Sequence, residues 1–172
     1  MGDALPANVD RAARIETWLD LYGDAILRSC YTWLKDKQLA EDAMQECFFK
    51  AWKAMDRFDN SAGNEKAWLM RIAINTCKDF KKSPWSRHVD RAQDMDNLPP
   101  HLLLAEDEDQ ALYLSILSLP LKHRQILLLY HYHGLTLKEC AQALGIVLTS
   151  ARYRLKKAEL LLKQQLEKGE GL

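Results

Sequence analysis

The stretch 136-TLKECAQALGIVLTSARYRLKKA-158 decides the fold of the C-terminal part of the chain. Thr136 and Glu139 form a T-x-x-E capping box, which predicts a short helix over Leu137–Leu144. Gly145 then turns the chain, and a longer helix is predicted from about Leu148 to Leu166. A short capped helix, a tight turn and a longer helix are the parts of a helix-turn-helix.

The second of these helices carries side chains suited to DNA. Basic groups supply salt-dependent affinity for phosphates, and polar groups at a helix start can reach base edges. Ala151, Leu155 and Ala158 recur at spacings that pack inward. The alternative is an ordinary amphipathic helix with a solvated basic face. The candidate DNA-binding residues are Thr149, Ser150, Arg152, Tyr153, Arg154, Lys156 and Lys157.

Helical spacing also dominates the rest of the chain, and no long strand-like alternation occurs, so the predicted fold class is all-α. Asp107–Asp109 are acidic residues that suit a helix N-terminus, and Pro120 starts a further helix that runs to about Tyr132. The N-terminal part shows three apolar stripes that indicate amphipathic helices. Their members are Ile15, Trp18, Leu19, Tyr22, Ile26 and Leu27; Ala40, Ala43, Met44, Cys47, Phe48, Ala51, Trp52 and Met55; and Trp68, Leu69, Ile72, Ala73 and Cys77.

The periodic pattern fades between residues 83 and 106, where Pro84, Pro99 and Pro100 interrupt helices. A segment of this length is long for a loop inside one compact domain. It is also acidic, whereas residues 111–172 are basic, so the zero net charge of the chain hides an uneven distribution. We therefore predict two small helical domains, 1–82 and 107–172, joined by a flexible acidic linker over 83–106.

Two segments of the N-terminal domain present candidate binding residues. On the helix around Ala40–Trp52, four residues share one exposed face at three- and four-residue spacing, and acidic groups beside an aromatic suit protein docking; a solvated face is the alternative. These residues are Asp42, Gln45, Glu46 and Phe49. In Phe58–Lys82 a polar loop leads into a helix that could present amide and basic groups to single-stranded DNA while the loop accepts an unstacked base. The candidates there are Asn60, Ser61, Asn64, Lys66, Arg71, Asn75 and Lys78, with Trp68 expected in the core.

Several classes of protein are excluded by the composition. No run approaches the roughly 20 apolar residues of a membrane span, and the N-terminus lacks a secretory signal pattern, so we expect a cytoplasmic protein. The four cysteines are scattered without zinc-ligand spacing, which favours reduced, buried thiols and no metal site. No catalytic triad, carboxylate pair or glycine-rich phosphate loop is suggested. We expect no cofactor, no small-molecule substrate and no enzymatic activity.

The three binding segments, in this order, resemble those of extracytoplasmic-function (ECF) RNA polymerase sigma factors. Glu41–Trp52 is similar to the family's D-x-x-Q-E-x-F segment, which implies that Asp42, Gln45, Glu46 and Phe49 dock on core RNA polymerase. Phe58–Lys82 resembles the region that melts and reads the minus-10 element, and Leu119–Leu155 the domain that reads the minus-35 element. The resemblance implies a transcription initiation factor whose partners are core polymerase, promoter DNA and an anti-sigma factor, which in relatives is often anchored in the membrane.

The sequence departs from the family pattern at two places. Val147 and Leu148 follow Ile146 where relatives carry a polar residue, and relatives often have an aromatic residue near Glu65. Val147 has no side-chain acceptor for a helix N-cap, so either the helix starts later with Thr149 as its cap, or it starts uncapped with Leu148 exposed or covered by a partner; we favour the second. A stand-alone helix-turn-helix regulator and a sigma-like interaction protein without promoter activity remain alternative functions.

Overall fold

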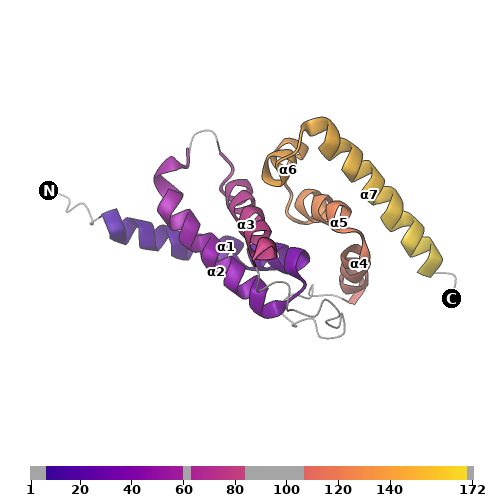
Figure 1. Cartoon of the computed structure of the whole chain (residues 1–172), viewed down its shortest axis with the longest axis horizontal. Helices are drawn as coiled ribbons and strands as arrows, with labels where there is room; N and C mark the ends of the chain where they lie inside the picture. The colour runs from indigo at the N-terminus through magenta and orange to yellow at the C-terminus, as the bar shows by residue number, and fades with distance from the viewer. Residues whose placement is uncertain (1–6, 60–62, 84–106, 170–172) are drawn as a thin grey trace.

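The computed structural model describes residues 7–59, 63–83 and 107–169, and they are helical almost throughout (Figure 1). The all-α fold class is therefore confirmed. The N-terminal half contains α1 (Ala7–Leu34), α2 (Lys37–Ala54), a short 3-10 helix (Met55–Arg57) and α3 (Glu65–Lys82). The C-terminal half contains α4 (Asp107–Ser118), α5 (Leu121–Leu127), a π-helix (Leu128–Tyr132), α6 (Leu137–Leu144) and α7 (Leu148–Gly169). None of the described helices is long and apolar enough to cross a membrane.

In the N-terminal half, α1, α2 and α3 pack against one another through their apolar stripes. Trp18 and Ile26 of α1, Ala43 of α2 and Leu69 of α3 are almost fully buried. Leu19 is the exception, because its side chain is exposed although the sequence pattern placed it on the apolar stripe.

The start of α3 is fixed by a polar cap above an aromatic cluster. The Asn64 side-chain oxygen accepts the backbone amides of Lys66 and Ala67, so Asn64 is the N-cap of α3. Beneath it the ring centroid of Trp68 lies 5.6 Å from that of Trp18 and 5.1 Å from that of Phe58. Trp68 is thus a half-buried packing residue, as predicted.

The C-terminal half contains the predicted helix-turn-helix. Thr136 and Glu139 make both hydrogen bonds of the capping box, and α6 ends at Leu144 as expected. Gly145 adopts the left-handed conformation, with φ 68°, that a residue with a side chain would adopt only under strain. The chain then enters α7 at Leu148.

The helix predicted from Pro120 to about Tyr132 exists but changes its hydrogen-bond pattern halfway. Pro120 is the N-cap of α5, and from Leu128 to Tyr132 the chain forms a π-helix. The amide of His133 accordingly donates to the carbonyl of Leu128. The buried Arg124 secures the preceding turn, since its Nη1 donates to the carbonyls of Leu117 (3.0 Å) and Leu119 (3.4 Å) at the end of α4.

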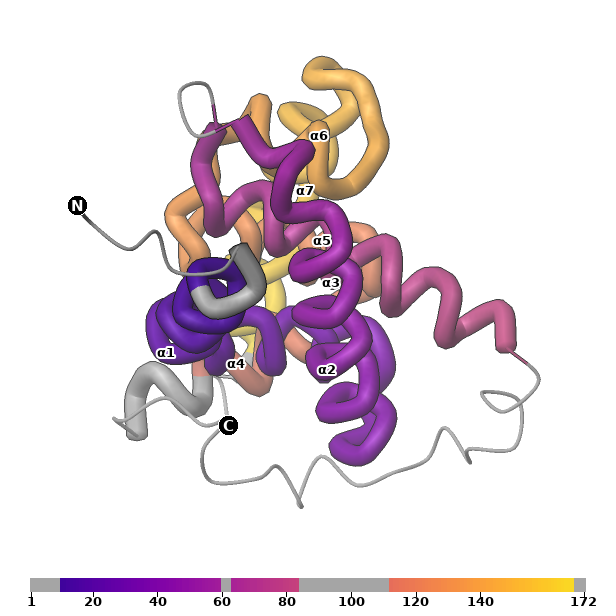
Figure 2. The backbone as a smooth tube through the Cα atoms, turned by 90° about the vertical axis from the view of Figure 1, so that its left-hand side faces the viewer, coloured from indigo at the N-terminus to yellow at the C-terminus, as the bar shows by residue number. Residues whose placement is uncertain are grey.

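The two halves lie side by side, α3 against α6 and α1 against α5 (Figures 1 and 2). The sequence predicted two domains joined by a linker and did not anticipate this contact. Of the predicted linker, Ser83 ends α3, and residues 84–106 lie outside the described residues.

Candidate nucleic-acid and docking surfaces

The basic side chains of α7 face solvent because its apolar residues face the opposite way. Ala151 and Ala158 are fully buried and Leu155 nearly so, which confirms the packing register predicted for this helix. On the other side, solvent reaches most of the candidate minus-35 residues, whereas Ser150 and Arg154 are half-buried. The exposed ones are Thr149, Arg152, Tyr153, Lys156 and Lys157. The face can therefore offer cations and hydrogen-bonding groups to a DNA groove without unpacking the domain.

The start of α7 agrees with the prediction of an uncapped helix that begins at Leu148. The helix begins at Leu148, and the carbonyl of Val147 accepts the amide of Ala151 at 3.1 Å. Val147 thus occupies the cap position with a side chain that has no acceptor. Its side chain is 67% exposed and that of Leu148 is 43% exposed, so two apolar groups stand at the entrance of the recognition helix.

One buried histidine of the helix-turn-helix domain lies near the basic side chains of α7. Desolvation is the main cause that lowers the pKa of His123, and the nearby cations Lys122, Lys157 and Arg154 lower it further, against a hydrogen bond with the backbone of Arg154 that raises it. No ion pair is found for Arg154 among the described residues, so a structural salt bridge does not compete there with a role in DNA binding.

The candidate minus-10 residues divide into three groups. Arg71 and Asn75 are exposed on α3. Lys78 faces the C-terminal half instead, because its amine donates to the carbonyl of Leu144 at 3.3 Å. Lys66 is half-buried, and its charge contributes to lowering the pKa of His133. Asn60 and Ser61 lie outside the described residues, and Asn64 caps α3.

Glu65, where relatives often have an aromatic residue, ties α3 to α1. Its carboxylate accepts a hydrogen bond from Arg14 Nη2 at 2.9 Å. The same carboxylate contributes to raising the pKa of Tyr22, after desolvation as the first cause. The backbone at Gly63 also lies close to the ring of Phe58, because a Cβ atom at this position would be 2.9 Å from that ring. The departure at Glu65 is thus compensated by a polar contact between the two helices.

On α2, one face combines carboxylates, an amide and an aromatic ring. Gln45 and Phe49 are exposed and Asp42 and Glu46 half-buried, and the ring of Phe49 stacks near Trp52 with 6.5 Å between centroids. The aromatic position of the D-x-x-Q-E-x-F segment falls on Phe48, which is only 5% exposed and belongs to the core. Phe49 is therefore assigned to this face because its side chain is exposed, and not because it matches the motif.

The cysteines are structural in their placement, and two of them lie close together: a hydrogen bond with Cys77, followed by burial, raises the pKa of Cys30. All four are free and buried, as the sequence predicted. Burial raises the pKa of Cys47 and of Cys140 to about 12, so both thiols stay protonated at neutral pH. Within the described ranges no cluster of histidine, cysteine and acidic residues could hold a metal ion.

Sequence reasoning missed a set of buried polar residues between the two halves. Ser29 and Thr32 of α1, Gln125 of α5 and His133 after the π-helix are each less than 9% exposed. Ser29 and Thr32 could have indicated this contact, because their spacing places them on one face of α1. A polar pair at that spacing, however, usually indicates a solvated face. Only the position of the C-terminal half shows that this face is covered.

Comparison with known proteins defines the class. Residues 9–87 match the family model of sigma-70 region 2, and residues 109–162 match that of sigma-70 region 4. The fold is similar to that of the sigma factor RpoE of Bartonella quintana, solved with the anti-sigma factor NepR (TM-score 0.68, 23% identity, 88% of this chain and 96% of that chain). It is also similar to CnrH, solved with the cytosolic domain of CnrY (TM-score 0.62, 21% identity, 90% and 88%). The class is that of RNA polymerase sigma factors.

The curated relatives narrow the class to one family. The chain is 30% identical over 162 residues to the ECF RNA polymerase sigma factor SigW of Bacillus subtilis, with 86% of each chain covered. It is 29% identical over 141 residues to the ECF RNA polymerase sigma-E factor of Escherichia coli, with 73% of each chain covered. The chain belongs to the ECF RNA polymerase sigma factors. It is a transcription initiation factor that binds core RNA polymerase and directs it to promoters.

Proposed function

We propose that the three surfaces divide the work of promoter recognition. The α2 face (Asp42, Gln45, Glu46 and Phe49) docks on core polymerase. The Asp59–Lys66 loop and α3 act on the opened minus-10 element, and α7 binds the minus-35 element. The observation that carries this proposal is the α2 face, since a stand-alone DNA-binding regulator has no use for an acidic and aromatic surface remote from its helix-turn-helix.

The minus-10 assignment rests on exposure and on charge. Arg71 and Asn75 reach solvent from α3, and Lys78, near its C-terminal end, supplies a further cation once its amine leaves the carbonyl of Leu144. Amide groups can pair with base edges of an unstacked strand, and cations follow its backbone. Asn60, Ser61, Asn64 and Lys66 complete the proposed minus-10 set.

The domain division and the partners follow from the same proposal. Residues 1–82 form the docking and melting domain and residues 107–172 the minus-35 domain. The chain itself makes and breaks no covalent bond, because the polymerase holds the catalytic site. Two structurally similar sigma factors were solved with an anti-sigma factor or with the cytosolic domain of a partner, so we assign this chain an anti-sigma partner as well. An anchor in that partner would hold the chain at the inner face of the membrane.

Charge reversal on α2 tests the docking assignment. The double variant Asp42→Lys/Glu46→Lys places two cations four residues apart on the proposed face. Interface charges that lose their partners commonly cost a few kcal/mol, so affinity for core polymerase should fall at least about tenfold. The matched control is Asp20→Lys/Asp24→Lys, which makes the same change at the same spacing on exposed positions of α1.

Co-elution with core polymerase and fluorescence titration measure the binding. Circular dichroism checks that both variants keep the helicity of the parent. If the α2 variant binds core as tightly as the parent, the docking assignment is wrong. If the parent binds duplex DNA specifically without polymerase, the stand-alone regulator becomes the better account. If the parent binds core but directs no transcription, the chain is a sigma-like interaction protein.

A further inference from the structure

Tyr153 on α7 is the most exposed of the large apolar side chains in the described part of the chain. Solvent reaches 69% of its surface, and no ring partner is found for it among the described residues. A single exposed apolar residue is ordinary on a protein surface, so its surroundings decide what it means. The folded chain gives this ring no packing role, and its function has to be sought in what its neighbours bind.

The neighbours of Tyr153 are cations and a hydroxyl group. Thr149, Lys156 and Lys157 lie three or four residues from it on the same side of the helix, Arg152 directly precedes it, and all four are exposed. Residues 148–158 contain no aspartate or glutamate. A partner of this face therefore carries negative charge around an apolar spot of about the size of a ring or a methyl group.

Charge within the domain keeps this face free of carboxylates. Glu159 is the first acidic residue that follows, and its carboxylate lies 3.0 Å from Nε2 of His131, which comes from the π-helix. An acidic side chain on α7 is thus turned toward its own domain and not toward the cations around Tyr153. The phosphates of duplex DNA complement such a face.

The major groove of DNA supplies the apolar spot. Thymine presents its C5-methyl group there, next to the O4 acceptor, and apolar side chains distinguish thymine by contact with that methyl group. The hydroxyl group of Tyr153 loses little in solvent, because water satisfies it, whereas the ring gains free energy only when apolar surface covers it. The ring is therefore the part of Tyr153 that a thymine would bind.

Tyr153 also stands at the depth along α7 where base edges are expected. It is in the second turn of a helix that begins at Leu148, and recognition helices place their N-terminal residues against the bases. Leu160 is the other exposed apolar residue on this side of α7, 48% exposed and two turns further along, or roughly 10 Å from Tyr153 along the helix axis. Leu160 thus lies beyond the part of α7 that enters the groove.

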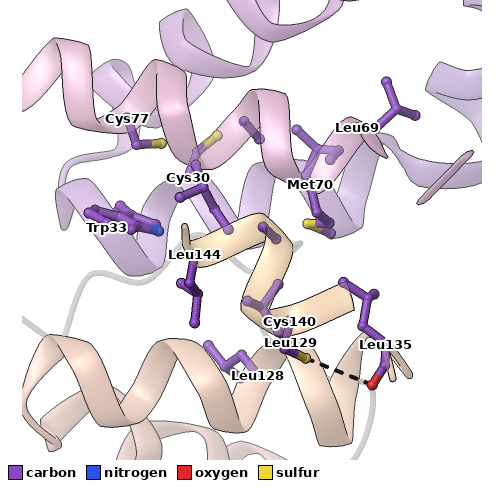
Figure 3. Close-up of a cluster of buried hydrophobic side chains, with 14 of the residues drawn as sticks. Cys30, Trp33, Leu69, Met70, Cys77, Leu128, Leu129, Leu135, Cys140 and Leu144 are labelled. Atoms are coloured by element: carbon purple, nitrogen blue, oxygen red, sulfur yellow. Dashed lines mark hydrogen bonds between the residues drawn. The ribbon is translucent and has the colours of Figure 1, made fainter. Parts of the chain in front are cut away.

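The helix that carries Tyr153 is held in place from behind. Ala151 is fully buried on the inward side of α7. The preceding helix α6 is fixed by the Cys140 thiol, which donates to the carbonyl of Leu135 at 3.8 Å, and by Leu144, which lies next to Leu128 in the apolar core (Figure 3). A side chain on a fixed element needs little ordering when it binds, so a small apolar contact can discriminate between bases.

We propose that Tyr153 is a specificity-determining residue, whose ring packs against the C5-methyl group of a thymine in the minus-35 element while the cations around it bind the DNA backbone. This inference rests on the proposed binding of the minus-35 element by α7. The ring makes the contact, and the hydroxyl group is dispensable. The minus-35 element of this chain then contains a thymine whose methyl group contributes to binding.

Replacement of thymine by deoxyuridine tests the contact, because deoxyuridine pairs in the same way and lacks only the methyl group. The duplex is one selected by core polymerase with the parent chain from a random-sequence library, and each thymine of its upstream element is replaced in turn, on both strands. Loss of one buried methyl-sized group should weaken binding of the parent complex about fourfold at one position. Fluorescence anisotropy measures the affinity.

Three variants assign this loss to the ring. Tyr153→Ala should bind the unmodified duplex more weakly and lose nothing further at that position, whereas Tyr153→Phe should keep the fourfold loss. Leu160→Ala is the matched control, since it removes an exposed apolar side chain from the same side of α7, and it should behave as the parent does. Urea unfolding checks that the variants are as stable as the parent, as expected for exposed positions.

Four outcomes overturn the inference: an upstream element without thymine, a parent that loses no affinity at any deoxyuridine, a Tyr153→Ala variant that keeps the fourfold loss, or a Tyr153→Phe variant that behaves as alanine does. The last would show that the hydroxyl group makes the contact. If parent and polymerase select no upstream element at all, the proposed function fails together with the inference. Each of the four outcomes, in contrast, leaves the proposed function standing.

Discussion

At the scale of single residues, Val147 leaves the start of α7 without a side-chain cap. Its carbonyl closes the first turn of α7, but its side chain cannot accept a backbone amide. Replacing it by serine should satisfy one of the free amides at the start of α7 and raise the free energy of unfolding by about 0.5–2 kcal/mol. Urea unfolding of the full chain measures this gain.

Val147→Ala is the matched control, since it shortens the side chain without adding an acceptor. The alanine variant should leave stability within about 0.5 kcal/mol of the parent, because Val147 is mostly exposed. An equal gain from alanine, or a loss from serine, would show that Val147 acts through packing and not through the missing cap.

Asn64 has a structural role that must be separated from a role in melting. Its side-chain oxygen caps α3, so Asn64→Ala should cost about 0.5–2 kcal/mol of stability, whereas Asn64→Asp keeps the acceptor and should cost little. Aspartate lacks the amide donor and adds negative charge. If Asn64 contacts the opened strand, both variants should impair permanganate-detected opening of a promoter.

Asn75 provides the comparison for Asn64, because it is exposed in the middle of α3 and caps nothing. Asn75→Ala should impair opening of an ordinary promoter more than binding to a pre-melted one. Equal defects on both templates would contradict a melting role for α3. If Asn64→Asp opens the promoter as well as the parent does, Asn64 is a cap only.

Residues that cap or turn a helix could be predicted from the sequence, whereas the burial of individual side chains on a helix could not. The capping box at Thr136 and the left-handed Gly145 could be predicted because both are local devices with a fixed spacing. That Phe48 is buried and Phe49 exposed could not be predicted from the motif, since it depends on which side of α2 the other helices cover.

At the scale of elements, the sequence predicted where helices exist better than how they end. Pro120 located the start of α5, because a proline at a helix start is a local property of the sequence. The π-helix that follows at Leu128–Tyr132 was not predicted. Its altered hydrogen bonding arises where Leu128, Leu129 and His133 pack on the N-terminal half, which is a tertiary cause.

The basic face of α7 allows a prediction about salt. Each phosphate contact that is removed should flatten the slope of log affinity against log salt by about 0.9. Lys156→Ala should therefore weaken binding of the polymerase complex to a promoter and reduce the slope by about that amount. Fluorescence anisotropy over a range of salt concentrations measures both quantities.

Lys163→Ala is the control on the same helix, because Lys163 is exposed near the C-terminal end and pairs with Glu167 at 3.8 Å. It should leave both the affinity and the slope unchanged. An unchanged slope for Lys156→Ala would remove Lys156 from the DNA interface. A reduced slope for Lys163→Ala would extend that interface along the whole of α7.

At the scale of the whole molecule, the packing of the halves was beyond sequence analysis. Ser29 and Thr32 resemble a solvated helix face until the C-terminal half covers them. The all-α class and the helix-turn-helix followed from local patterns, whereas this contact depends on pairing two separately plausible surfaces. No periodicity within one helix encodes which other helix it meets.

His133 makes the packing sensitive to pH. Desolvation lowers its pKa to about 3, and the charged groups that act on it are Lys66 of α3 and Arg28 of α1, both cations. When the halves separate, His133 regains water, and its pKa should return toward about 6.5. The state with separated halves then binds the proton more tightly than the packed state does. The contact between the halves therefore has its full stability above about pH 6.5 and loses it as the pH falls toward 3.

Lowering the pH from 7.5 to 5.5 should therefore shift the equilibrium between packed and separated halves about tenfold toward separation. Small-angle scattering of the full chain at the two pH values checks this. His133→Gln, which cannot gain a proton, should remove the shift over that range. If the halves of the parent separate no more at pH 5.5 than those of His133→Gln do, His133 is not the titrating group.

The central claim is that one chain, together with polymerase, reads two separate promoter elements. The most direct measurement is selection of duplexes from a random-sequence library by core polymerase with and without the parent chain, followed by sequencing. The account predicts two conserved elements at a fixed separation, both dependent on polymerase, with Lys156→Ala weakening selection of the upstream element and Asn75→Ala that of the downstream one. Recovery of a single element, or of the same sequences by the chain alone, would contradict it.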